Sequence, residues 1–498
     1  MEAFFLREKI LWNEDWLFCA EPLPARAFSV KGPLYKQAKT ERARSGPAAR
    51  IANWKSEWLD AMQKIGGQGM KRLLVRERYF YWEDGEPFFY LGDTAWELLH
   101  QLNREEIARY MALRAQQGFT VVQTVALAEL DGLRVPNAYG RKPLLDGENG
   151  QPDPTQPDVA GDYSYWDHVD YAVETAAEHG LVIALLPTWG DKFCSLWGKG
   201  PCVFTPENAY QYGKWLGARY ASRWNILWML GGDRALNETT RPIIDRMAEG
   251  IREADGAHLM TFHPPGSHNS TEYLNDAAYI DFHTAQTGHD VAKCYPSDAE
   301  MRAMSLASAK PYMDSEPRYE DHPACFNEKL GYYWQAADVR QNAYWDVFAG
   351  ACGHTFGNHN IWCCNANPNA YYPHRWQEAL DHPAAGQMRW VKRLRLRGDY
   401  ASFRPAPEVL VEQYAGEGHL AAARGEGYCY VYTPLGMPFT VRLAAIAAPG
   451  NVLKAYWMDP RTGEEKMFGV YPVMGENLFV PPSRGKGEDW VLILEAAR

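Results

Sequence analysis

The chain has 498 residues, of which 46% are hydrophobic and 23% charged, and its formal net charge is −11. This composition indicates a soluble globular protein of more than one domain and excludes disordered and fibrous classes. The negative charge argues against a nucleic-acid partner, and the apolar runs are shorter than the roughly 20 residues that a membrane helix needs.

Residues 1–70 form an N-terminal extension that fits no regular pattern, and we assign it no function. It contains a basic stretch, "KQAKTERARSGPAAR", that is typical of a solvated connector. The first residues lack the apolar run and cleavage site of a signal peptide. The nine cysteines have no metal-finger spacing, which favours reduced thiols. We therefore expect a cytoplasmic protein.

An alternation of strand-like and helix-like segments begins near residue 87. The segment "PFFYLGDTAW" (87–96) predicts a strand, and Asn103 with Glu106 predicts a capped helix that ends at Gly118. The segment 119–127 is an apolar, β-branched strand. An insertion rich in Pro, Gly and Asp follows from about 130 to 160.

The alternation continues in the second half of this region. A helix that ends at Gly180 precedes the strand 181–189, and Thr205-Pro206 opens a helix that runs to about Arg223. The strand 225–230 and the helix 241–256 repeat the pattern. Shorter strand units follow at 259–266, 278–289, 310–320 and 353–362, with helices at 338–349 and 388–400.

Eight apolar strands separated by helices predict an α/β fold, a closed (β/α)8 barrel over residues 71–399. The number of strands stays open by one around 258–290, where the helices are short. Residues 400–498 consist of short alternating segments such as "YCYVYTP" and "WVLILE". This pattern predicts a C-terminal antiparallel β-sandwich.

Two carboxylates come directly after apolar strands, Asp233 after the fourth and Glu316 after the seventh. Barrel closure would bring both to the same mouth, where barrel enzymes carry their reactive groups. Such a pair is what glycoside hydrolysis needs. Gly231 and Gly232 would let a substrate approach the backbone there. Two structural alternatives stay open: Asp233 as a helix cap or turn residue, and Glu316 in an ion pair with Arg318.

Other polar and aromatic residues of the same strand ends are candidates for substrate binding. Asp93 holds sugar hydroxyls or caps the next helix, and Gln123 requires a polar partner inside its strand. Aromatic faces suit the C–H face of a sugar. The full set of binding candidates is Asp93, Trp96, Gln123, Trp189, His263, His283, Gln286, His289, Tyr319, His354, Asn358 and Trp362.

Several other chemistries lack their motifs. The histidines make metal-dependent hydrolysis the second hypothesis. Neither HxH after the first strand nor HExxH occurs, so we predict no metal. A Walker A loop, a strand-linked GxGxxG and a GxSxG elbow are also missing, so we expect no cofactor and no serine hydrolase. Homo-oligomerisation through helices or the sandwich stays open.

Four segments in order resemble the apiosidase-like glycoside hydrolases: "YFYWEDGEPFFYLGDTAW", "WNILWMLGGDR", "PYMDSEPRYE" and "GHTFGNHNIW". The resemblance covers roughly residues 71–498 and implies a (β/α)8 barrel followed by a β-sandwich catalogued as collagen-binding. It implies exo-acting release of apiose from plant glycosides or pectin side chains. Asp233 would then be the acid/base and Glu316 the nucleophile, with Asp93, Gln286 and His289 in the sugar pocket.

The sequence therefore predicts an intracellular glycoside hydrolase that acts by retaining double displacement on a small or oligomeric plant-derived glycoside. The missing secretion signal favours a small imported glycoside over intact pectin. Two alternatives stay open. One is a hydrolase of the same fold for another sugar, such as an arabinofuranoside or a galactoside. The other is a carbohydrate-binding barrel without activity.

Overall fold

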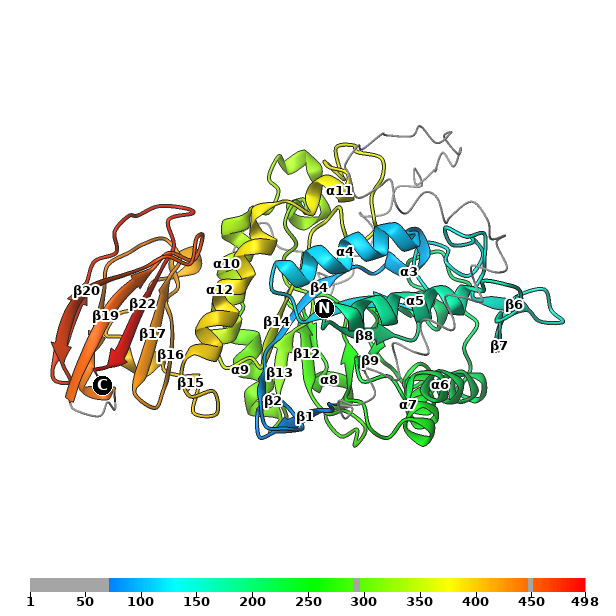
Figure 1. Cartoon of the computed structure of the whole chain (residues 1–498), viewed down its shortest axis with the longest axis horizontal. Coiled ribbons are helices and arrows are strands. Elements are labelled where there is room, and N and C mark those ends of the chain that lie inside the picture. The colour runs from blue at the N-terminus through cyan, green and yellow to red at the C-terminus, as the bar shows by residue number, and fades with distance from the viewer. Residues whose placement is uncertain (1–70, 290–295, 447–450, 498) are drawn as a thin grey trace, which may run out of the picture. The chain divides into compact units, whose positions relative to one another are not determined.

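The structure is a computed structural model that describes residues 71–289, 296–446 and 451–497. The N-terminal extension lies outside these residues. Within the described part of the chain, eight parallel strands form one sheet with helices around it (Figure 1). They are β4 (Tyr90–Thr94), β5 (Val121–Val125), β8 (Val182–Leu186), β9 (Ile226–Gly231), β10 (Met260–His263), β12 (His283–Gln286), β13 (Tyr312–Asp314) and β14 (Gly353–Phe356).

Side chains and backbone groups join the two outer parallel strands, β10 and β12, and so close the barrel. The Asp281 N–H donates to the Met260 carbonyl at 2.8 Å, and the Thr261 hydroxyl donates to the Phe282 carbonyl at 2.7 Å. A short antiparallel strand, β11 (His268–Asn269), is added beside β12. The predicted (β/α)8 barrel is confirmed, including both strands in the region where the count was open.

Helices follow most barrel strands, and the sequence signals at their ends are confirmed. Asn103 caps α4 in a capping box with Glu106, and Thr205 caps α6. The helices are α3 (Leu98–Gln101), α4 (Arg104–Gln116), α5 (Tyr165–Glu178), α6 (Pro206–Tyr220), α7 (Arg241–Ala254), α8 (Thr271–Leu274), α9 (Asp298–Ala307), α10 (Ala336–Phe348), α11 (Trp376–Ala379) and α12 (Pro383–Arg397). None of the helices in the described ranges is long and apolar enough to cross a membrane.

Two small sheets lie outside the barrel strands. The first contains β1 (Leu73–Arg76), β2 (Tyr79–Trp82) and β3 (Pro87–Phe88) and precedes the barrel. The second is the pair β6 (Leu144–Asp146) and β7 (Pro152–Pro157), which gives the predicted insertion an antiparallel core.

The C-terminal region is antiparallel, as predicted. One sheet has the order β15-β16-β17-β22-β19-β20, and β18 pairs with β21. Apolar side chains from both sheets share one core. The bounds are β15 (Arg404–Pro405), β16 (Ala421–Gly425), β17 (Tyr428–Thr433), β18 (Phe439–Arg442), β19 (Val452–Met458), β20 (Glu465–Pro472), β21 (Glu476–Phe479) and β22 (Trp490–Ala496).

Helices α10 and α12 lie between the barrel strands and the C-terminal sheets (Figure 1). Arg340 of α10 forms a bidentate ion pair with Asp489, with N–O distances of 2.6 and 2.9 Å, and both side chains are at most 3% exposed. Gln387 of α12 and Tyr432 of β17 complete the hydrogen bonds of this pair. A buried, fully bonded ion pair therefore fixes the sandwich to the barrel.

We predict that Arg340→Ala destabilises the protein by about 3–5 kcal/mol, because Asp489 would remain buried without its partner. Urea unfolding measures the change. Arg397→Ala is the matched control: it removes a half-exposed arginine that pairs with Glu465 and Glu495 of the same sandwich, and about 1 kcal/mol or less is expected. Equal effects of the two variants would contradict this account.

Candidate active site

Asp233 and Glu316 lie at the same end of the barrel. Each stands two residues beyond a parallel strand, Asp233 after β9 and Glu316 after β13. Parallel strands present their carboxyl ends at one rim, so the two side chains share the mouth. The next helix after Asp233 begins only at Arg241, so Asp233 caps no helix, but its φ of +60° makes it a turn residue, as one alternative predicted. Arg318 donates to Asn342.

The backbone before Asp233 follows a path that only glycines allow. Gly231 and Gly232 have φ of +96° and +111°. A Cβ on Gly231 would stand 2.4 Å from the His263 carbonyl oxygen, and one on Gly232 would stand 2.7 Å from the Gly190 nitrogen. The interpretation that these glycines make room for a substrate is therefore wrong. They let β9 turn tightly between the ends of β8 and β10 and so aim Asp233.

Two imidazoles hold the Glu316 carboxylate. His289 Nε2 donates to Oε1 at 2.9 Å, and His263 Nε2 lies 3.0 Å from Oε2. Burial raises the pKa of Glu316, but these contacts and the charge of the histidines outweigh it and hold the pKa well below its ordinary value. Ser315 fixes the His263 ring, with its Oγ 3.1 Å from Nδ1. Glu316 is therefore ionised throughout the neutral range.

The pKa of the Asp233 carboxyl group is shifted in the opposite direction. Burial and the nearby negative charge of Glu316 raise its pKa to about 6, against weaker opposing effects. The Trp197 indole donates to Oδ2 at 3.1 Å, and Arg234 lies 3.8 Å from the same oxygen. The Arg234 guanidinium also stacks on Trp197, 3.9 Å from the ring centre. The two carboxyls of one mouth thus differ in protonation near pH 6.

Aromatic rings and polar atoms without a protein partner gather around this pair. Trp96 contacts both Trp189 and His263, with ring centroids 5.3 and 5.2 Å apart. His289 lies against Tyr319 at 4.4 Å. Buried polar atoms near these rings have no hydrogen-bond partner in the described protein: Trp189 Nε1, Gln286 Oε1, His289 Nδ1 and Tyr319 OH. Buried polar groups are normally paired, so this cluster is suited to a polyhydroxylated ligand.

Asp93 and His354, both predicted to bind substrate, face the helix layer instead. Asp93 Oδ2 accepts from Arg114 Nε at 2.5 Å and from the Tyr110 hydroxyl, both on α4. His354 Nδ1 lies 3.0 Å from Asp346 Oδ2 on α10. These contacts direct both side chains toward the helix layer and so correct the prediction of a sugar contact, while Asp93 Oδ1 and His354 Nε2 have no hydrogen-bond partner within the described residues. Asp93 does not cap a helix either.

Gln123 is buried inside the barrel rather than in its mouth. Its amide accepts from the Tyr90 hydroxyl at 2.9 Å and donates to the Ser315 carbonyl at 3.0 Å. The predicted polar network is present, and it supports the strand end that carries Glu316. The expectation of a substrate contact is replaced by this supporting role.

Within the described residues, three further candidates make no hydrogen bond or ion pair with the two carboxyls, and His283 begins β12, at the end of that strand away from the mouth. His283 Nδ1 lies 2.9 Å from the Ser270 hydroxyl. Asn358 donates to Asp321 at 3.0 Å, so its amide positions a loop. Trp362 is half-buried.

Sequence reasoning missed Trp197 and Ser315, which act on the two carboxyls. Trp197 belongs to the irregular segment "SLWGKGP" between β8 and α6, where no periodicity marks an inward-facing residue. The only available signal was its place after a barrel strand. Ser315 stands beside Glu316 in the sequence.

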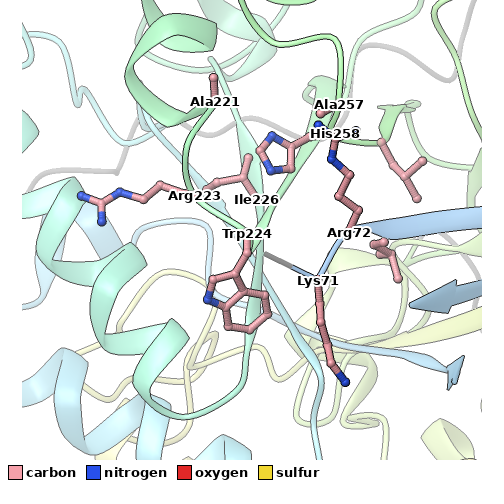
Figure 2. Close-up of a pocket in the computed structure, with 10 residues that line it drawn as sticks. Lys71, Arg72, Ala221, Arg223, Trp224, Ile226, Ala257 and His258 are labelled. Atoms are coloured by element: carbon pink, nitrogen blue, oxygen red, sulfur yellow. The ribbon is translucent and has the colours of Figure 1, made fainter. Parts of the chain in front are cut away.

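A small pocket at the other end of the barrel is a separate feature (Figure 2). Its volume is about 30 Å³, and its lining includes Arg72, Trp224 and Ile226. Ile226 begins β9, whose opposite end leads to Asp233. The carboxylates therefore do not belong to this pocket.

Comparison with known proteins gives consistent matches. A family model described as "Apiosidase-like, catalytic domain" matches residues 75–402, and one described as "Putative collagen-binding domain of a collagenase" matches residues 405–495. No curated protein matches the chain significantly.

Solved structures show the same architecture. One described as "Glycoside hydrolase" is 30% identical with a TM-score of 0.76, and the match covers 86% of this chain and 97% of the other. A glycoside hydrolase family 5 protein from Bacteroides vulgatus ATCC 8482 is also 30% identical with a TM-score of 0.76, over 86% of this chain and 94% of the other.

We predict that Gly232→Ala destabilises the protein by at least about 2 kcal/mol, because the new Cβ would clash with backbone at a left-handed φ. Gly386→Ala is the matched control: apart from its chain neighbours and the backbone of α12 itself, no atom lies within 4 Å of its Cβ position, and a neutral or stabilising change of up to about 1 kcal/mol is expected. Thermal unfolding compares the two. A Gly232→Ala protein as stable as wild type would refute the backbone argument.

Proposed function

This chain belongs to the apiosidase-like family of glycoside hydrolases, and we propose that it releases apiose or a related pentose from the end of plant-derived glycosides by retaining double displacement. The family model spans about two thirds of the chain, and both 30%-identical structures cover 86% of it. The sugar, the exo action and the stereochemical course belong to the proposal.

The observation that carries the mechanism is the opposite protonation of the two carboxyls. Asp233, with its pKa raised to about 6 by burial and by the charge of Glu316, holds a proton in mildly acidic solution. Glu316 stays ionised, because its histidine contacts outweigh the effect of burial on its pKa. A pair with these properties supplies an acid and a nucleophile at once.

In the first step, Asp233 gives its proton to the glycosidic oxygen while a Glu316 oxygen attacks the anomeric carbon. The bond between that carbon and the leaving oxygen breaks, the alcohol departs, and the sugar is esterified to Glu316. In the second step, Asp233 takes a proton from water, whose oxygen displaces Glu316 from the anomeric carbon. The sum is hydrolysis of one glycosidic bond, and both carboxyls return to their starting states.

The histidines contribute to both steps by holding Glu316. A carboxylate of lowered pKa is a good leaving group when water attacks the glycosyl ester. The hydrogen bond from His289 and the contact with His263 also fix the carboxylate before the sugar arrives, so the protein need not reorganise during reaction.

The cluster of unpaired polar atoms supports a small, hydroxyl-rich sugar as substrate. Trp96 and Trp189 supply aromatic faces, while Gln286, His289 and Tyr319 supply unpaired polar atoms. These groups would bind hydroxyls of the terminal sugar beside Glu316. The same features would accept an arabinofuranoside or a galactoside, so the sugar is settled by assay.

We also keep a cytoplasmic location as a proposal. The adjacent Cys363 and Cys364 are free thiols, as are Cys194, Cys202, Cys352 and Cys429. Free thiols agree with a reducing compartment.

We predict that the wild-type protein releases sugar from a panel of apiosides, arabinofuranosides and galactosides, with apiosides the best substrates. Glu316→Gln should lower kcat by about 10⁴-fold or more, because an amide cannot form the glycosyl ester. Reducing-sugar release measures turnover, and NMR of the first product should show the anomeric configuration retained.

The matched control for this variant is Glu328→Gln, a half-buried glutamate farther along the same segment, which should keep wild-type turnover. Release of another sugar with the same loss in Glu316→Gln would keep the mechanism and change the substrate. Sugar binding without turnover in wild type would favour the inactive binding barrel.

We predict that kcat/KM falls as pH rises through about 6, because Asp233 must carry a proton in the first step. The acid limb should lie much lower, since Glu316 stays ionised there. Trp197→Phe removes a hydrogen bond that favours the Asp233 carboxylate, so the basic limb should move upward by less than about one pH unit. Activity measured from pH 4 to 9 gives both limbs.

The control for the pH experiment is Trp224→Phe, since Trp224 lines the pocket at the far end of the barrel (Figure 2). Its basic limb should coincide with that of wild type. A limb near pH 8 in wild type, or equal shifts in both variants, would exclude Asp233 as the acid.

A further inference from the structure

Three potential metal ligands meet beside the candidate active site without taking part in it. Asp321, His374 and His382 each offer one ligand atom, and these atoms all lie within 4.8 Å of one another. The three residues come from different segments: Asp321 follows β13, His374 lies in the connection after β14, and His382 caps α12. The fold, rather than a local motif, brings them together.

The three side chains are arranged closely enough for one ion. His382 Nδ1 lies 2.8 Å from Asp321 Oδ2, and the rings of His374 and His382 meet edge to face at 4.7 Å. Ligand atoms on a tetrahedral ion with bonds of about 2.0–2.1 Å stand roughly 3.4 Å apart. Small side-chain movements would therefore create the coordination geometry, and the half-buried position keeps the cluster accessible.

Two asparagines hold the cluster from behind. Asn358 and Asn360 donate to Asp321 Oδ2 at 3.0 and 3.1 Å. The Asn360 side-chain oxygen also accepts from the His374 backbone N–H at 3.0 Å. Hydrogen bonds of this kind orient metal ligands in proteins. The ligands are thus positioned by a polar network that is independent of any ion.

From this juxtaposition we propose that Asp321, His374 and His382 bind one divalent transition-metal ion of the zinc class, with the remaining position open to water. Two imidazole nitrogens and one carboxylate oxygen suit such an ion, whereas calcium and magnesium favour oxygen ligands throughout. Sequence motifs could not reveal this site, because its ligands are separated by long intervals.

The bound ion would brace the wall of the sugar pocket. His322 follows Asp321 and stacks on His289 with centroids 4.2 Å apart, and His289 donates to Glu316. His359 stands between the two supporting asparagines and contacts His322 at 4.3 Å. The ion would link the segments after β13 and β14 to α12, so its role is structural and separate from glycosidic chemistry.

The first test is zinc binding to the full-length protein after removal of metal with a chelator. Titration calorimetry and elemental analysis should give one ion per chain, and zinc should raise the unfolding temperature. His374→Gln should weaken zinc binding by at least about 100-fold, because it removes a direct ligand. His268→Gln, which alters a half-exposed histidine paired with Glu272, should bind zinc like wild type.

His374→Gln also separates a metal site from a purely hydrogen-bonded cluster. Within the described residues the His374 imidazole makes no hydrogen bond, so the metal-free variant should unfold at the wild-type temperature and lose only the rise caused by zinc. Glu316→Gln should bind zinc normally, which keeps this test independent of the proposed activity. Cobalt substitution should give a spectrum without the intense bands of thiolate ligation.

Two results would overturn the proposal. The first is an absence of stoichiometric zinc binding in wild type. The second is undiminished binding in His374→Gln or a thiolate spectrum with cobalt, since either would place the ion elsewhere on the chain.

Discussion

The ionised Glu316 in the barrel mouth is the constraint on which the rest of the site depends. A buried carboxylate is costly unless neighbouring groups favour its charge. His263 at the end of β10 and His289 in the segment after β12 do so. The charge they preserve then acts on Asp233 and raises its pKa. One set of contacts therefore fixes the protonation of both carboxyls, and neither can be understood alone.

This electrostatic arrangement requires accurate strand ends. His263 pairs in register with Gly231, so the strand that supplies an imidazole to Glu316 is the neighbour of the strand that leads to Asp233. Asp314 accepts from the Glu316 backbone N–H at 3.1 Å and steadies the turn after β13. Side chains inside the barrel, such as Gln123, connect this turn to β5. The packing of the barrel core thus determines the distance and orientation of the side chains at the strand ends.

The sequence was sufficient for the order of the barrel strands and for the two carboxyls, because continuous apolar runs and capping residues are local signals. It was insufficient for the direction of individual side chains. Every residue of β4 and β14 is buried, so the sequence does not distinguish the inner face of these strands from the outer face. No sequence pattern therefore indicated that Asp93 and His354 point toward the helix layer. Trp197 lies in an irregular segment, and the steric need for Gly232 depends on Gly190 of another strand end.

In the proposed mechanism, substrate selectivity lies outside the pair of Asp233 and Glu316. In the mechanism we propose, Asp233 and Glu316 would act on any anomeric centre that reaches them, so they would not distinguish a branched pentose from a hexose. The discrimination must come from the pocket wall, where Gln286 and Tyr319 have unpaired polar atoms and Trp96 offers an aromatic face. A sugar that leaves these atoms unpaired would lose more binding than one that lacks a single apolar contact. The wall is built from segments after β12 and β13, so changes in these connections would alter the preferred sugar while the reaction stays the same.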